Sequence, residues 1–135
     1  TVTATLSGLT LQTWLAYSLT DKYILSSAGV EYRSPSLDTV ISMFTVTGVN
    51  YNNSSGTMPS VSVNDGAYKI LVCKDMGPGC SHTIYFGPGN LIAPNPLNAT
   101  SIPTKLVFKR KSQSAQLIYD GDAWILLNSG AYVVE

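Results

Sequence analysis

Residues 114–127, SAQLIYDGDAWILL, decide the fold class of this 135-residue chain. Two apolar runs, 117–119 and 124–127, flank the pair Asp120-Gly121, and a pair of this type favours the positive φ angles of a tight turn. Apolar runs on both sides of such a turn are typical of a β-hairpin. The stretch therefore predicts two antiparallel strands joined by a two-residue turn, with Trp124 buried against them.

The rest of the chain repeats these features: short stretches in which apolar and polar residues alternate, separated by turn-forming residues. An alternation with period 2 marks a half-buried strand. The expected strands cover residues 10–19, 22–26, 30–33, 39–47, 67–74, 82–86, 105–109, 115–119, 123–127 and 131–134. The pattern predicts an all-β fold, either a jelly-roll-like antiparallel β-sandwich or a barrel, with about 9–12 short strands.

Length predicts a single domain that spans residues 1–135. A chain of this size buries roughly two-thirds of the surface that its unfolded form exposes, so one core is sufficient. Residues 50–60, NYNNSSGTMPS, have the composition of a linker. We expect them to form an exposed loop inside this domain, because separate domains of about 50 and 75 residues would be marginally stable.

Charge excludes several classes of partner. Eight basic and eight acidic residues give a net charge of zero, and nucleic-acid binding normally relies on a positive surface, so we expect no nucleic-acid partner. No apolar run approaches the roughly 20 residues that span a bilayer, so we expect a soluble protein without membrane insertion. Charged residues make up only 12% of the chain. A surface so poor in charge favours self-association, which predicts a homo-oligomer.

The two cysteines leave two hypotheses open. Cys73 and Cys80 flank residues 74–79, KDMGPG, which favour a turn. A hairpin at this point would bring the two side chains near bonding distance and allow a disulfide. The alternative is a pair of reduced, partly buried thiols. Two cysteines and one histidine cannot supply the four ligands of a structural zinc, and we expect no metal and no cofactor.

The residues that could carry catalysis are few. His82 is the only histidine, and no Gly-x-Ser-x-Gly element accompanies it, so we interpret it as a residue at the edge of a strand. Asp120 and Asp122 could form a carboxylate pair or a calcium site, but they fit better at the tip of the predicted hairpin. The sequence therefore predicts a protein that is not an enzyme.

Two groups of residues could contact a partner. The basic run Lys109-Arg110-Lys111 could bind an anionic partner, although charges at a strand edge also block unwanted strand pairing. Trp14 and Tyr51 could serve as aromatic platforms for a glycan if they are exposed. Most aromatic residues of a β-domain fill the core instead.

The C-terminal part of the chain carries a recognisable pattern in residues 65–72, 106–108 and 112–131. A polar lead at 112–114 precedes an apolar strand, an Asp-Gly turn, a Trp and a Ser-Gly ending. In this order, the pattern resembles β-rich structural domains of virions, such as tail-fibre, spike and capsid-associated proteins of phages and large double-stranded DNA viruses. The resemblance covers residues 65–135, and neither Cys73 nor Cys80 belongs to it.

The resemblance implies a non-enzymatic viral structural protein, a capsid-associated or fibre-like domain for assembly or attachment, located in the virion and often trimeric. Its partners would be copies of itself, another virion protein or a host-surface glycan. We expect the subunits to meet through apolar strand faces, with residues 9–19 and 131–134 as candidate contact strands. The alternative is a secreted, lectin-like module that binds carbohydrate.

Overall fold

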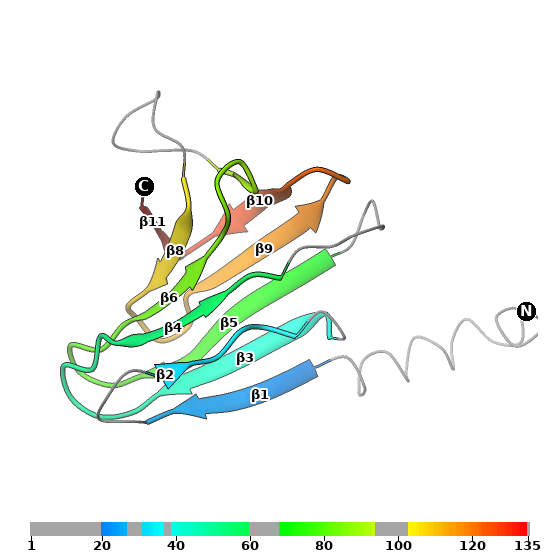
Figure 1. Ribbon diagram of the computed structural model, residues 1–135. Coiled ribbons are helices and arrows are strands. Elements are labelled where there is room, and N and C mark those ends of the chain that lie inside the picture. The colour runs from blue at the N-terminus through cyan, green and yellow to red at the C-terminus, as the bar shows by residue number, and fades with distance from the viewer. Residues whose placement is uncertain (1–19, 27–30, 37–38, 60–67, 94–102, 135) are drawn as a thin grey trace, which may run out of the picture.

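The structure is a computed structural model, and it describes residues 20–26, 31–36, 39–59, 68–93 and 103–134. These residues form eleven strands in two sheets and contain no helix (Figure 1). The prediction of an all-β fold is therefore confirmed, and the number of strands falls within the expected range. The expected strand at residues 10–19 lies outside the described residues, as does Trp14.

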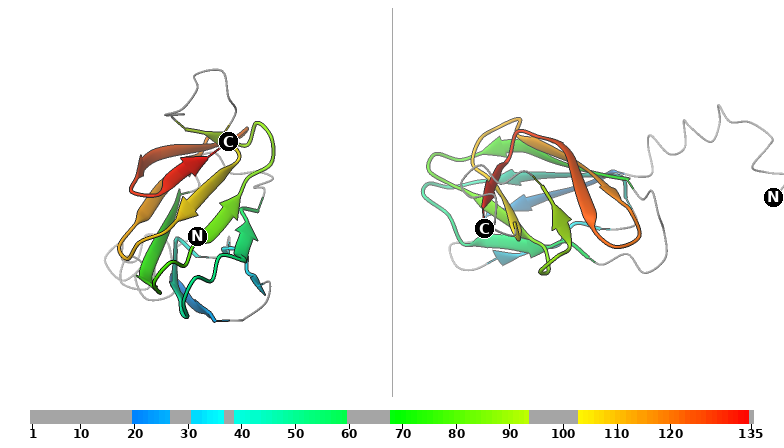
Figure 2. Two further views of the ribbon diagram at one scale, coloured as in Figure 1. Left: turned by 90° about the vertical axis from the view of Figure 1, so that its left-hand side faces the viewer. Right: turned by 90° about the horizontal axis from the view of Figure 1, so that it is seen from above.

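Both sheets contain strands from the two halves of the chain. The six-stranded sheet has the order β1 (Thr20–Leu25), β3 (Ile41–Val46), β5 (Tyr68–Met76), β9 (Ser114–Tyr119), β10 (Trp124–Ser129) and β7 (Leu91–Ile92). The five-stranded sheet has the order β11 (Tyr132–Val134), β8 (Lys105–Phe108), β6 (His82–Tyr85), β4 (Ser54–Thr57) and β2 (Glu31–Tyr32). Two further views show the sheets facing each other (Figure 2).

The first six strands alternate between the two sheets. We call each pair of successive strands, one in each sheet, a coil: β1 with β2, β3 with β4, and β5 with β6. β1, β3 and β5 are parallel neighbours in one sheet, and β2, β4 and β6 are parallel neighbours in the other. The prediction of a wholly antiparallel fold is wrong here, and both sheets are mixed. Parallel neighbours need a long crossover connection, which is usually a helix. In this chain a strand of the opposite sheet takes the place of that helix, because two successive reversals restore the original direction.

The second half of the chain closes the sheets with antiparallel pairs. β9 pairs with β5 and β10, and β8 pairs with β6 and β11. The predicted hairpin is present with Tyr119 opposite Trp124, so its loop has four residues instead of two. Asp120 stabilises this loop, since its carboxylate accepts hydrogen bonds from the backbone N–H groups of Asp122 and Ala123, both at 2.8 Å. Gly121 adopts a φ of 99°, which explains the need for glycine.

The described part of residues 50–60, which ends at residue 59, does not form the expected exposed loop. Ser54–Thr57 is strand β4, which lies between β2 and β6. Ser54 and Gly56 face inward, and Tyr51 and Met58 on either side of the strand are buried. Small residues fit here because the backbone of the neighbouring chain segment passes very close to Gly56. The small residues Ser54 and Gly56, which resemble a linker in the sequence, are therefore those that fit between closely packed backbones.

The core lies between the two sheets. Phe44 of β3 packs against the rings of Phe108 in β8 and His82 in β6, with ring centroids 5.1 Å and 4.7 Å apart. Trp124 is only 3% exposed, as the sequence predicted, and its ring lies edge-on to Tyr119. The sheets thus share one apolar interior that includes residues from both halves of the chain.

Candidate functional site

The basic run that the sequence singled out lies on the surface between β8 and β9. Lys109, Arg110 and Lys111 are all exposed. The side-chain oxygen Oε1 of Gln113 accepts hydrogen bonds from the backbone N–H groups of Lys109 and Arg110, at 2.6 Å and 2.8 Å. The connection therefore has a fixed backbone, and its charged side chains extend toward solvent.

Tyr51 is not an aromatic platform for a glycan. Its side chain is only 8% exposed and belongs to the core. The expected contact at Tyr51 is therefore wrong, for the same reason that the loop prediction at 50–60 is wrong: this segment packs between two other strands. Trp14, the other expected platform, lies outside the described residues.

Cys73 and Cys80 are free, buried thiols, and no disulfide joins them. β5 and β6 belong to different sheets, so the expected hairpin between the cysteines is a crossing from one sheet to the other. Cys80 Sγ accepts a hydrogen bond from the backbone N–H of Tyr51 at 3.3 Å. Burial raises the pKa of the Cys73 thiol to about 11, helped by the charge of Asp75. Both thiols are thus core side chains, and the raised pKa of Cys73 keeps that thiol protonated and unreactive.

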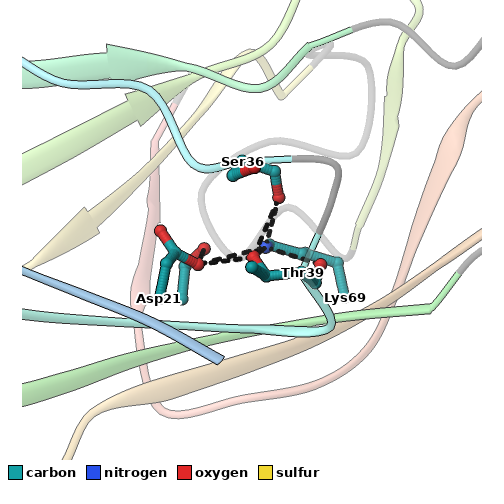
Figure 3. Close-up of polar contacts among 5 residues, drawn as sticks. Asp21, Ser36, Thr39 and Lys69 are labelled. Carbon is teal, nitrogen blue, oxygen red and sulfur yellow. Dashed lines mark hydrogen bonds and ion pairs between the residues drawn. The ribbon is translucent and has the colours of Figure 1, made fainter. Parts of the chain in front are cut away.

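A buried lysine stands at the centre of a cluster of polar residues (Figure 3). Lys69 lies in β5, and its side chain is 1% exposed. Its Nζ donates hydrogen bonds to the backbone oxygens of Ser36 and Thr39, at 2.6 Å and 3.0 Å, and to Thr39 Oγ1 at 2.8 Å. Asp21 Oδ1 lies 3.8 Å from Nζ and accepts hydrogen bonds from the hydroxyls of Thr39 and Ser42. We call these five residues the lysine network.

Burial and the nearby Asp21 carboxylate have opposite effects on the pKa of Lys69. Burial lowers the pKa of Lys69 to about 8 from 10.5, and the carboxylate of Asp21 opposes this shift. Removal of one partner of such a pair leaves an uncompensated buried charge, which is strongly destabilising. The network joins β1, β3 and β5 to the chain that enters β3, so it holds one end of the six-stranded sheet together.

Sequence reasoning missed the lysine network, although the alternation of residues contained its signal. Lys69 has the same parity in its strand as the buried Leu71 and Cys73. Asp21 likewise has the parity of Tyr23, and Ser42 has the parity of Phe44. Since alternate residues of a strand share a face, the pattern places each of these polar residues on the inward face. A polar residue at an inward position is the observation that would have identified the network.

His82 is a core residue and does not lie at an exposed strand edge. Its side chain is fully buried, and its Nδ1 lies 3.0 Å from Ser54 Oγ. Its Nε2 has no hydrogen-bond partner among the described residues. Burial lowers the pKa of His82 to about 4, so the ring is neutral at pH 7. The ring is therefore neutral and enclosed by the core, out of contact with solvent.

The outward side of the six-stranded sheet is unusually apolar for a surface. One row across four strands consists of Tyr68, Ile118, Ile125 and Ile92, which are neighbours in the β-ladder. Tyr68 is 40% exposed and Ile92 is 51% exposed. We define the apolar outer face by the outward-pointing large apolar residues of this sheet: Ile24, Ile41, Met43, Tyr68, Ile70, Val72, Ile92, Ile118 and Ile125.

One corner of the apolar outer face is hollowed. Lys22, Ile24, Met43 and Lys74 surround a groove of about 240 Å³ there. The two lysines place positive charge at this corner, whereas the rows farther along the sheet consist mainly of apolar and uncharged side chains. The face thus has an apolar centre and positive charge at one corner.

Comparison with known proteins gives no relative: no family model and no curated protein matches this chain. Among the described residues, no group of three or more His, Cys, Asp or Glu side chains could hold a metal ion. The same part of the chain contains no helix with the length and apolar character needed to cross a membrane.

Proposed function

We propose that this protein is a non-enzymatic structural domain that assembles with copies of itself through the apolar outer face. The observation that carries this proposal is the row of large apolar residues across four strands of the six-stranded sheet. Contiguous exposed apolar patches are rare on monomeric proteins, and larger ones mark interaction sites. Burial of this face against a second molecule would remove the patch from water.

A second copy of this chain is the partner that the charge pattern favours. A net charge of zero gives no long-range repulsion between identical molecules. The centre of the face is nearly uncharged, so two copies can meet there without burying like charges against each other. Closed cyclic symmetry is the usual arrangement of identical subunits. Threefold symmetry and a place in the virion, as a capsid-associated or fibre-like part, are supported by the resemblance in residues 65–135.

The association state of the purified protein tests this proposal. We expect light scattering at micromolar concentration to give a multiple of the 14.4 kDa chain mass. The substitution Ile70→Asp places a charge in the centre of the apolar outer face and should give monomers with an unchanged circular dichroism spectrum. Thr83→Asp is the matched control, because Thr83 lies on the outward side of the five-stranded sheet.

The outcomes separate the parts of the proposal. A monodisperse wild-type species of 14.4 kDa would contradict assembly. A dimer would retain the interface and exclude the trimer. If Thr83→Asp dissociated the oligomer and Ile70→Asp did not, the interface would lie on the other sheet.

The second candidate function, a secreted carbohydrate-binding module, is supported by tyrosines on the outward side of the five-stranded sheet. Tyr32 is 63% exposed and Tyr85 is 43% exposed. The Lys105 ammonium lies 5.9 Å from the centre of the Tyr85 ring, and Thr57 is the ladder partner of Tyr85. Aromatic faces beside hydroxyl groups suit the apolar and polar sides of a sugar. Glycan-array binding by the wild type that Tyr85→Ala abolishes would favour this function.

A further inference from the structure

We propose that Lys69 and Asp21 form an internal cross-link site, at which the lysine amine condenses with the aspartate carboxyl group to give an amide. The proposal concerns the lysine network and is independent of assembly. It rests on the placement of the two side chains and on the hydroxyl groups between them, all of which are held by the strands of the six-stranded sheet (Figure 3).

The two reacting groups are close and are linked by one hydroxyl. Lys69 Nζ lies 3.8 Å from Asp21 Oδ1. Thr39 Oγ1 accepts a hydrogen bond from Nζ at 2.8 Å and donates one to Asp21 Oδ1. Ser42 Oγ donates a second hydrogen bond to the same carboxylate oxygen at 2.6 Å. The Thr39 hydroxyl thus provides a direct path for a proton between the nitrogen and the carboxylate.

The first step is a proton transfer within the pair. The ammonium of Lys69 gives a proton to Thr39 Oγ1, which passes its own proton to the Asp21 carboxylate. This leaves a neutral amine and a neutral carboxylic acid. The amine remains hydrogen-bonded to the carbonyl oxygens of Ser36 and Thr39, and its new lone pair faces the side from which the proton left. That side is the one on which Asp21 lies.

The second step is the condensation itself. The amine lone pair attacks the Cγ atom of Asp21, so that a C–N bond forms, the C=O bond to Oδ2 opens and a negative charge develops on Oδ2. The hydroxyls of Thr39 and Ser42 contact Oδ1, the oxygen that received the proton in the first step. The C=O bond to Oδ2 then forms again as the C–Oδ1 bond breaks, and Oδ1 leaves as water with its own proton and a second proton from the nitrogen. No oxidant, reductant or co-reactant is needed.

The surroundings favour this reaction over the ion pair. Burial disfavours the charged ammonium, so it lowers the cost of forming the neutral amine. The burial of Lys69 is nearly complete, and it lowers the pKa of the amine. Two groups held in contact also react with effective molarities that reach roughly 10⁵–10⁸ M in well-oriented cases. Asp21 is 22% exposed, which leaves a way out for the water.

Mass spectrometry of the intact, folded protein tests the proposal. We expect the wild type to have a mass lower than its sequence by one water, and proteolysis to give a branched peptide that joins residues 21 and 69. Lys69→Arg keeps a positive charge but removes the amine, and we expect it to restore the full mass. Water could also be lost at the Asp-Gly pairs Asp65-Gly66 and Asp120-Gly121. Such a loss does not need Lys69, so Lys69→Arg would still show the lower mass if it were the cause.

The role of the hydroxyl is tested with a pair of variants at one position. Thr39→Val keeps the shape of the side chain and removes the proton path, so we expect most of the protein to retain the full mass. Thr39→Ser restores a hydroxyl and should recover the cross-link. A folded wild type with the full mass and separate, unbranched peptides would overturn the proposal, and equal cross-linking in Thr39→Val would overturn the proton path.

Discussion

At the scale of single residues, polar side chains in the core determine how this protein responds to pH. His82 is enclosed by Ser54 and the ring of Phe44, and its pKa is lowered to about 4. An unfolded chain exposes the ring and returns its pKa to the ordinary value of about 6.5. The folded and unfolded states therefore bind different numbers of protons between these two pH values.

We predict that the folded state loses stability as the pH falls from about 6.5 to about 4. In this window the unfolded state binds more protons than the folded state, so acid favours unfolding. A shift of this size corresponds to about 3 kcal/mol, and above pH 6.5 the contribution of His82 is constant. Urea unfolding at a series of pH values measures the effect.

His82→Gln is the control, because its side chain does not titrate. Carboxylates also titrate toward the lower end of this window, so the difference between wild type and variant isolates the histidine. Parallel stability curves for the two proteins would contradict the prediction. A difference that grows only below pH 6.5 would support it.

At the scale of strands, the close packing of the Arg33 backbone against Gly56 of β4 can be tested by adding one methyl group at Gly56. A Cβ atom on Gly56 would lie 2.0 Å from the backbone oxygen of Arg33, so the backbone must shift. We predict that Gly56→Ala lowers the free energy of unfolding by about 1–3 kcal/mol, as overpacking does. Gly130→Ala is the matched control, since its Cβ would meet nothing closer than 3.7 Å.

Urea unfolding of the two glycine variants measures these effects. Gly130→Ala should have unchanged or slightly higher stability, because alanine reduces the conformational freedom of the unfolded chain. Equal stability of Gly56→Ala and the wild type would show that the pairing of β2 with β4 adapts to the extra methyl group.

The sequence predicted most strands of this fold but not their directions. Alternation with period 2 is the same in parallel and antiparallel strands, so it located β3, β5 and β9 without indicating how they pair. β4 escaped detection because Ser54–Thr57 contains no large apolar residue. For the apolar outer face, the sequence predicted only that subunits meet through apolar strand faces. Its position depends on which strands are neighbours, and this is a property of the folded chain.

At the scale of the whole molecule, the proposed assembly predicts that thermal stability depends on protein concentration. An oligomer that dissociates on unfolding is stabilised by mass action, so its Tm rises with protomer concentration. We expect this rise for the wild type and not for Ile70→Asp. Calorimetry at concentrations that differ by about a hundredfold measures it, and a constant wild-type Tm would contradict an equilibrium between oligomer and unfolded chain.

The alternation of β1 to β6 between the two sheets has a consequence for how such a molecule could change in length. Each coil contributes one strand to each sheet and hydrogen-bonds only to the coils on either side of it. Among the coils, the closing strands β8 and β9 form strand pairs only with the last one, through β6 and β5. Duplication of one coil would therefore extend both sheets by one strand and leave the closing end unchanged. The architecture thus allows the molecule to be lengthened by added coils while the strands of the closing end keep their pairing.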